Sequence, residues 1–170
     1  MKAKGIVSGY VIEIVLATLV TGFACSTLGE GRLCDFVHQS ASEWAQLTTA
    51  FFGAAVAAWL TFANFRATEF GDFLDDLGAI SVFSKAFLVS IYVHLFATVA
   101  SIGAKGSNWH PIAILAAFLL CYSLINVVTL FSNAAELIHL YGQFRRQARS
   151  HRQEGGSDRR MISKDRAEEC

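Results

Sequence analysis

Four long apolar blocks constrain this chain more than any other feature of its sequence. They are separated by short charged stretches and cover Gly5–Cys25, Leu47–Phe65, Ala86–Ala104 and Pro111–Phe131. An α-helix needs roughly 20 mostly apolar residues to cross the hydrocarbon core of a bilayer, and each block has about that length. The sequence therefore predicts an all-α protein, a transmembrane bundle of four helices that contacts lipid. Pro111 agrees with this, because proline is well tolerated in the first turn of a helix.

The distribution of basic residues predicts how the four spans are oriented. Two lysines precede the first span, two basic residues lie between the second and third spans, and eight of the 14 Lys and Arg residues follow residue 144. The first and third loops carry one each, Arg32 and Lys105. Because basic residues collect on the cytoplasmic side, we expect both termini and the second loop in the cytoplasm, as in an inner (plasma) membrane protein. Trp44 and Trp109 then lie at the opposite interface, where aromatic residues are enriched.

The first span has a competing interpretation. Two lysines, an apolar stretch and the triplet Gly22-Phe23-Ala24 before Cys25 resemble a signal peptide. Glu13 lies in the middle of that stretch and argues against cleavage, because the apolar region of a signal peptide is uninterrupted. We therefore expect the span to be retained, and the other spans keep their orientation in either case.

The end of the chain differs in composition from the rest. We assign residues 1–150 to the four-span bundle and residues 151–170 to a charged cytoplasmic tail. The tail has few large apolar residues and cannot bury enough surface to offset the entropy of ordering, so it is predicted to be disordered.

The loop between the second and third spans predicts a short amphipathic helix over Glu69–Leu77, with apolar residues at helical spacing. The acids on its other face are Asp72, Asp75 and Asp76. The basic residues at the inner end of the fourth helix include Arg145, Arg146 and Arg149. Two interpretations stay open: the arginines pair with these acids, or they bind lipid phosphates at roughly 1 kcal/mol each. We prefer both to binding of nucleic acid.

No motif indicates an enzyme, a cofactor or a metal site. The sequence contains no glycine-rich phosphate loop, no His-Glu-x-x-His and no paired-cysteine metal spacing. Cys25 and Cys34 are both expected on the outer side, where a disulfide between them can persist. Two free thiols are an equal alternative.

Ionisable residues inside the spans are the main functional candidates, because at membrane depth each needs a partner or water. Glu13 is eight residues into the first span, roughly 12 Å from the inner surface at 1.5 Å per residue. His94 reaches about the same depth from the same side in the third span, so a Glu13–His94 pair is geometrically reasonable. Asn126 in the fourth span belongs to the same polar interior.

Each span also carries a stripe of small or polar residues at helical spacing. The stripes are Gly9, Glu13, Ala17, Thr21 and Ala24; Thr49, Gly53, Ala57, Thr61 and Asn64; Ser90, His94, Ala97, Ser101 and Ala104; and Tyr122, Asn126, Thr129, Asn133 and Glu136. In a structural interpretation, these residues let the helices pack closely and bond to one another. In a functional one, they line a narrow hydrated path whose constriction is formed by Glu13, His94 and Asn126.

Several features of the layout occur together: four spans, a long first loop, a cytoplasmic second loop, a short third loop before the proline-led fourth helix (Trp109-His110-Pro111), and a charged inner tail. In these features residues 1–150 resemble the four-span membrane component of the Rex phage-exclusion system, which is regarded as an ion channel. The chain differs from it in its acidic second loop and in the acid of the first span, so no functional residue is carried over.

The resemblance implies a small pore, or ion-conducting effector of phage defence, that works with a cytoplasmic sensor protein. We expect it to be oligomeric, because four short helices alone enclose little lumen. Colicin-type immunity proteins are similar in size and topology and imply an alternative. On that alternative the chain is a non-conducting interaction protein, either an immunity factor or a subunit of a larger membrane complex.

Overall fold

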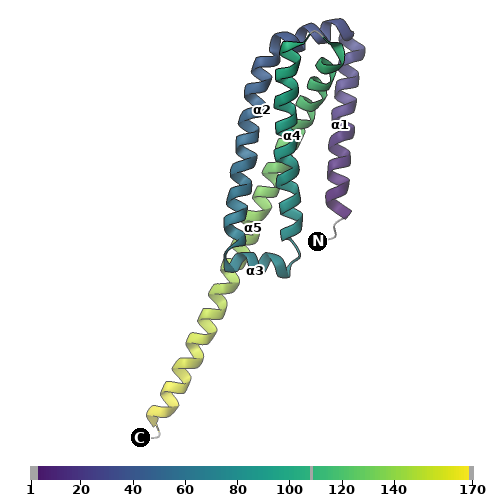
Figure 1. Ribbon diagram of the computed structural model, residues 1–170. Coiled ribbons are helices and arrows are strands. Elements are labelled where there is room, and N and C mark those ends of the chain that lie inside the picture. Colours follow the sequence, from purple (N-terminus) through teal and green to yellow (C-terminus); the bar gives the residue numbers. More distant parts are fainter. Residues whose placement is uncertain (1–3, 108, 169–170) are drawn as a thin grey trace. The chain divides into compact units, whose positions relative to one another are not determined.

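The computed structural model describes the backbone of residues 4–107 and 109–168, and the side chains of residues 10–107 and 109–149. Within these ranges the regular structure is entirely helical. The helices are α1 (Lys4–Leu28), α2 (Glu30–Arg66), α3 (Glu69–Asp76), α4 (Ile80–Gly106) and α5 (His110–Glu168) (Figure 1). The chain divides into two units, Met1–Ala134 and Ala135–Cys170, and α5 contributes to both.

Four of the helices, α1, α2, α4 and α5, are long and apolar enough to cross a membrane. This confirms the all-α class and the four apolar helices that the sequence predicts. Many large apolar side chains point outward, among them Leu19, Val99 and Val128, which are 63%, 58% and 66% exposed. An apolar exterior of this extent is typical of a surface that contacts lipid or another protein.

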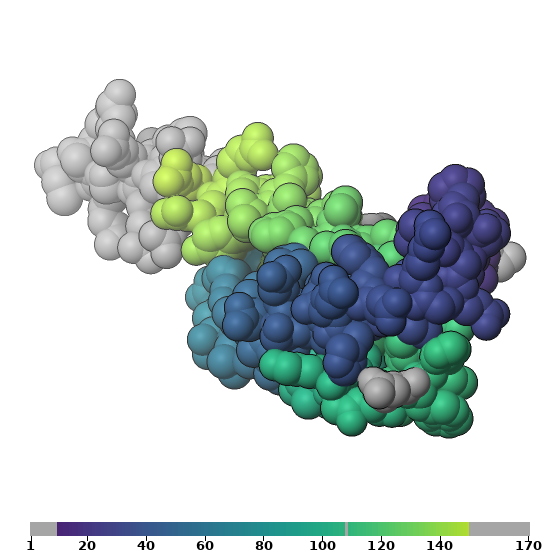
Figure 2. All heavy atoms as spheres, turned by 90° about the horizontal axis from the view of Figure 1, so that it is seen from above, coloured from purple at the N-terminus to yellow at the C-terminus, as the bar shows by residue number. Residues whose placement is uncertain are grey.

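The predicted long first loop is instead helical. A turn at Gly29, with a φ of 76°, separates α1 from α2, and α2 then runs for 37 residues, well beyond the roughly 20 that a bilayer requires. Its first turns lie across one end of the bundle before the helix continues beside α4 (Figures 1 and 2). Leu33, Val37 and Ala41 recur every fourth residue and are buried, an apolar helical face that the loop prediction overlooked.

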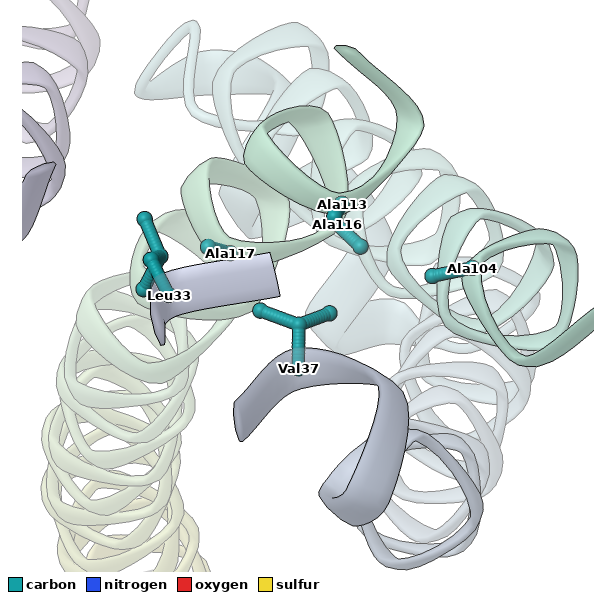
Figure 3. Close-up of a cluster of buried hydrophobic side chains, with 6 residues drawn as sticks. All are labelled: Leu33, Val37, Ala104, Ala113, Ala116 and Ala117. Atoms are coloured by element: carbon teal, nitrogen blue, oxygen red, sulfur yellow. The ribbon is translucent and has the colours of Figure 1, made fainter. Parts of the chain in front are cut away.

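A small apolar cluster closes this end of the bundle (Figure 3). Val37 points from α2 toward alanines near the end of α4 and the start of α5. The cluster consists of Leu33, Val37, Ala104, Ala113, Ala116 and Ala117. Because alanine side chains are short, they let these helices approach one another closely.

A cluster of phenylalanines joins α2, α3 and α4 at the opposite end. The ring centroid of Phe62 lies 5.6 Å from that of Phe87 and 6.2 Å from that of Phe83. Phe70 of α3 packs edge-on against Phe65 of α2, with centroids 5.6 Å apart. This end of the bundle is therefore filled by aromatic rings, where the sequence stripes predict small and polar residues.

The short helix α3 lies at the corner between α2 and α4. Phe70 and Leu74 are buried, while its aspartates, Asp72, Asp75 and Asp76, are exposed. Gly71 permits the tight corner, because a Cβ atom there would lie 2.2 Å from the carbonyl oxygen of Arg66. The cytoplasmic position of this segment remains a prediction.

The second unit continues α5 from Ala135. Within it, the Arg145 guanidinium lies 5.9 Å from the centre of the Tyr141 ring. The sequence predicts a disordered tail from residue 151, whereas the backbone stays helical to Glu168. Extending an existing helix needs no new nucleus, and the Arg, Lys, Gln and Glu residues of this segment are good helix formers. The low hydrophobicity of this segment indicates that it does not pack into a core. It does not decide whether the segment forms a helix.

Candidate functional site

Glu13 is a buried carboxylate on α1, with 4% of its surface exposed. Its partners come from α5: Asn126 Nδ2 donates a hydrogen bond to Oε2 at 3.0 Å, and the Thr129 hydroxyl donates one to Oε1. The two donors are three residues apart and therefore share one face of α5. Among the described side chains no lysine or arginine is buried. Neutral donors thus stabilise this carboxylate, and no cationic side chain that the structure describes is buried beside it.

His94 lies fully buried on α4. Its Nδ1 atom is 2.7 Å from the Ser123 hydroxyl of α5, and its ring centroid is 5.6 Å from that of Phe51 of α2. Its other ring nitrogen, Nε2, is buried without a hydrogen-bond partner. Ser123 and Asn126 are three residues apart, so the face of α5 that holds His94 also holds Glu13.

The direct Glu13–His94 pair suggested by the sequence is not formed. Both side chains bond to α5 instead, one through Asn126 and Thr129 and the other through Ser123. The depth of each residue follows from its position in the span, but the sequence does not show that α5 supplies the partners of both. Asn126 bonds to Glu13, so these two predicted residues do belong to one polar interior. The sequence analysis did not identify Ser123 as the partner of His94.

The small and polar stripes identify the buried faces of α1 and α4. On α1, the buried members are Glu13, Ala17 and Thr21. On α4, they are Ser90, His94, Ala97, Ser101 and Ala104. On α5, Asn126 is buried and Tyr122, Thr129 and Asn133 are half-buried. These faces therefore give the first unit a polar interior.

The prediction that the small and polar stripe of α2 faces the interior is wrong. All of its members are exposed: Thr49, Gly53, Ala57, Thr61 and Asn64. The helix instead buries Thr48, Ala55 and Phe62, and the Thr48 hydroxyl lies 2.9 Å from the Thr98 hydroxyl of α4. Phe62 belongs to the aromatic cluster, which fixes the rotation of α2. Small residues can face outward in a membrane, because burying them against another helix gains no hydrophobic energy there.

Five buried polar atoms have no hydrogen-bond partner in the described part of the chain. They are Tyr10 Oη, Thr21 Oγ1, Ser90 Oγ, His94 Nε2 and Asn126 Oδ1. At 1.5 Å per residue, Tyr10 and Thr21 are roughly 16 Å apart along α1, and Ser90 and His94 are roughly 6 Å apart along α4. Buried polar groups nearly always bond to protein or to ordered water. Each of these atoms is therefore a place where water or an ion is favoured.

A groove opens beside Glu13, between α1 and α5. It has a volume of about 520 Å³. Its lining residues are Ile12, Glu13, Leu16, Leu124, Ile125, Val128 and Thr129. Several of these apolar side chains are themselves exposed on the outer surface of the bundle, Val128 most of all. The groove is thus an apolar depression with a carboxylate in its wall.

Two further groups of residues were predicted to be functional, the cysteines of the first unit and the arginines of the second. Cys25 and Cys34 are half-buried and pack against the apolar cluster at the α1–α2 end. Both are free thiols in the structure, and a disulfide between them remains a prediction. Arg145, Arg146 and Arg149 are exposed in the second unit, and their pairing with the acids of α3 also remains a prediction. Within the described residues, no group of three His, Cys, Asp or Glu side chains is arranged to hold a metal ion.

Function must therefore be inferred from two features, the four apolar helices and the buried polar site between three of them. No protein-family model matches the chain, and no similar curated protein or solved structure was found.

Proposed function

We propose that this chain is a multi-pass inner-membrane protein that conducts protons or small cations through the polar interior of its bundle. Glu13 is the ion-binding group, and His94 and Asn126 line the path beside it. The proposal rests on one observation: within the described side chains, a buried carboxylate has no buried cation beside it, and buried polar atoms of the same interior have no hydrogen-bond partner. At membrane depth such a carboxylate is unfavourable unless it takes up a proton or a cation.

Water bonded to the unpartnered atoms would place proton carriers in this interior. Both ends of the bundle are packed with apolar side chains. Phe62, Phe83 and Phe87 fill one end, and Val37 lies in the alanine cluster at the other. The packed ends favour a closed resting state that opens on a signal, as an effector requires.

The wider role follows the sequence predictions. The distribution of basic residues favours cytoplasmic termini and a cytoplasmic α3, so a cytoplasmic sensor would act on the exposed acids of α3 or on the arginines of α5. A part in phage defence derives from the Rex resemblance, and assembly into an oligomer is proposed because four short helices alone enclose little lumen.

Proton flux into liposomes tests the conduction path. We expect the purified protein to carry protons down an imposed gradient under some condition of a pH series. Glu13→Gln and His94→Ala should slow the flux about tenfold or more, the effect of roughly 1.4 kcal/mol on the barrier. Glu43→Gln changes an exposed glutamate of α2 and should leave the flux unchanged. If the Glu13 and His94 variants both keep full flux while eluting as folded protein, the path is wrong.

A second function is favoured by the exposed stripe of α2. Small residues on an outward face, such as Gly53 and Ala57, let a helix of another membrane protein approach closely, and a polar one such as Asn64 can bond to it. In this case the chain is a non-conducting interaction protein, such as an immunity factor or a subunit of a larger complex. Gly53→Leu and Ala57→Leu should then abolish activity, while Glu13→Gln should not.

A further inference from the structure

The groove between α1 and α5 has a composition that restricts what it can bind. Its walls are apolar except for Glu13 and Thr129. Ile12, Leu16 and Val128 on its wall are 55%, 44% and 66% exposed, so the groove opens at the side of the bundle. In a bilayer that side faces hydrocarbon, and a ligand would enter from the membrane phase.

The Glu13 charge in the groove has no buried cationic partner among the side chains that the structure describes. Both oxygens of Glu13 accept hydrogen bonds from neutral donors, Asn126 and Thr129, and no lysine or arginine is buried among the described side chains. A buried anion that has hydrogen-bond donors but no cationic partner keeps an uncompensated charge, which is unfavourable. A ligand that brings a positive charge to Glu13 is therefore favoured over a neutral or anionic one.

The apolar walls decide what kind of cation fits. A hard metal cation such as Ca²⁺ or Mg²⁺ keeps about six or more oxygen ligands, whereas the lining offers the side-chain oxygens of Glu13 and Thr129 alone. A cation that carries its own apolar body would instead contact Leu16, Leu124 and Val128. The volume of about 520 Å³ lies within the usual range of small-molecule sites.

We propose that this groove binds a lipophilic organic cation, of the ammonium or phosphonium class, whose charge pairs with Glu13 and whose apolar body contacts the walls. This cation site uses the same carboxylate as the proposed ion conduction. It rests on the proposed function in one respect, that Glu13 is an ion-binding group. It adds a ligand class and an entry from the side of the bundle.

Equilibrium dialysis of the purified full chain in detergent tests the site, with tetraphenylphosphonium as the probe and tetraphenylborate, of the same shape and opposite charge, as its control. We expect saturable binding of the phosphonium alone. Glu13→Gln should weaken it about tenfold or more, because the only charge in the groove is lost. Glu43→Gln, which removes an exposed carboxylate, should have no effect.

Two variants that fill the groove and retain Glu13 separate the site from general partitioning into the micelle. Val128→Trp and Leu124→Trp should each abolish saturable binding, whereas Val99→Trp, on the exposed face of α4, should preserve it. Each variant is compared by gel filtration, and either groove variant suffices if the other does not fold. Binding that persists in the folded groove variants overturns the inference, as does unsaturable uptake by the wild type.

The two proposals fail in different ways. Proton flux that depends on Glu13, without saturable phosphonium binding, supports conduction and overturns the cation site. Saturable binding that depends on Glu13 and on an open groove, without flux at any pH, supports the cation site and overturns conduction.

Discussion

At the scale of single residues, Glu13 has two roles: its hydrogen bonds hold two helices together, and its carboxylate is the proposed ion-binding group. Its carboxylate is held by Asn126 and Thr129, which lie more than 110 residues away in the sequence. These bonds join α1 to α5. The acid and its depth could be recognised from the sequence, because a charge interrupts an apolar block. The donors could not be assigned to it, since several spans carry similar polar residues.

Asn126→Ala tests the hydrogen bond to Glu13. The change leaves Oε2 of a buried carboxylate without its donor, and it should destabilise the protein by about 1–3 kcal/mol. Thermal unfolding in detergent measures the difference. Asn64→Ala removes an exposed asparagine of α2 and should stay within about 0.5 kcal/mol of the wild type. Equal stability of the two variants would show that the bond contributes nothing.

At the scale of the helices, the rotation of α1 and α4 could be predicted and that of α2 could not. On α1 and α4 the small and polar stripe is the buried face. On α2 the stripe is exposed, and the aromatic cluster around Phe62 turns another face inward. Contacts among α2, α3 and α4 make that choice, so a pattern within α2 alone does not reveal it.

Gly71→Ala tests the corner between α2 and α3. The new Cβ would lie 2.2 Å from the Arg66 carbonyl oxygen, and overpacking of this kind costs about 1–3 kcal/mol. Thermal unfolding should show the loss, and limited proteolysis should cleave near α3 sooner. Gly22→Ala, where the new Cβ would meet nothing within 4 Å apart from the adjacent backbone of its own helix, should be as stable as the wild type or more so. A Gly71 variant that matches this control would contradict the tight corner.

Oxidation tests whether Cys25 and Cys34 can bridge the turn between α1 and α2. Both thiols pack against the same apolar cluster, so a mild oxidant should form an intramolecular disulfide, detected by mass spectrometry of peptides. A loop this short should add up to about 3 kcal/mol. Cys121→Ser should oxidise as the wild type does, and Cys34→Ser should not. Free thiols at both positions after oxidation would refute the pairing.

At the scale of the whole molecule, the four apolar helices could be read from hydrophobic length alone, because a bilayer sets the length of a span. The first loop was mispredicted, since polar residues conceal the buried row of Leu33, Val37 and Ala41. The polar interior agrees with the stripes of three helices. Its closure by apolar packing at each end depends on contacts between helices, and the sequence did not predict it.

Labelling of single cysteines tests the proposed topology. In a background with the native cysteines replaced by serine, Asp72→Cys on the exposed face of α3 should react with a membrane-impermeant maleimide only in inverted vesicles. Arg32→Cys, exposed near the start of α2, should react only from the outside of intact cells. Labelling of both from the same side would contradict the assignment based on basic residues.

The central claim is that Glu13 binds the ion that crosses the bundle. The most direct test compares proton flux into liposomes containing the wild type, Glu13→Gln or no protein, at one imposed potential and equal protein content. We predict flux for the wild type and a rate for Glu13→Gln that approaches that of empty liposomes. Equal flux through the wild type and Glu13→Gln would contradict the claim, and so would a wild type no faster than empty liposomes across the pH series.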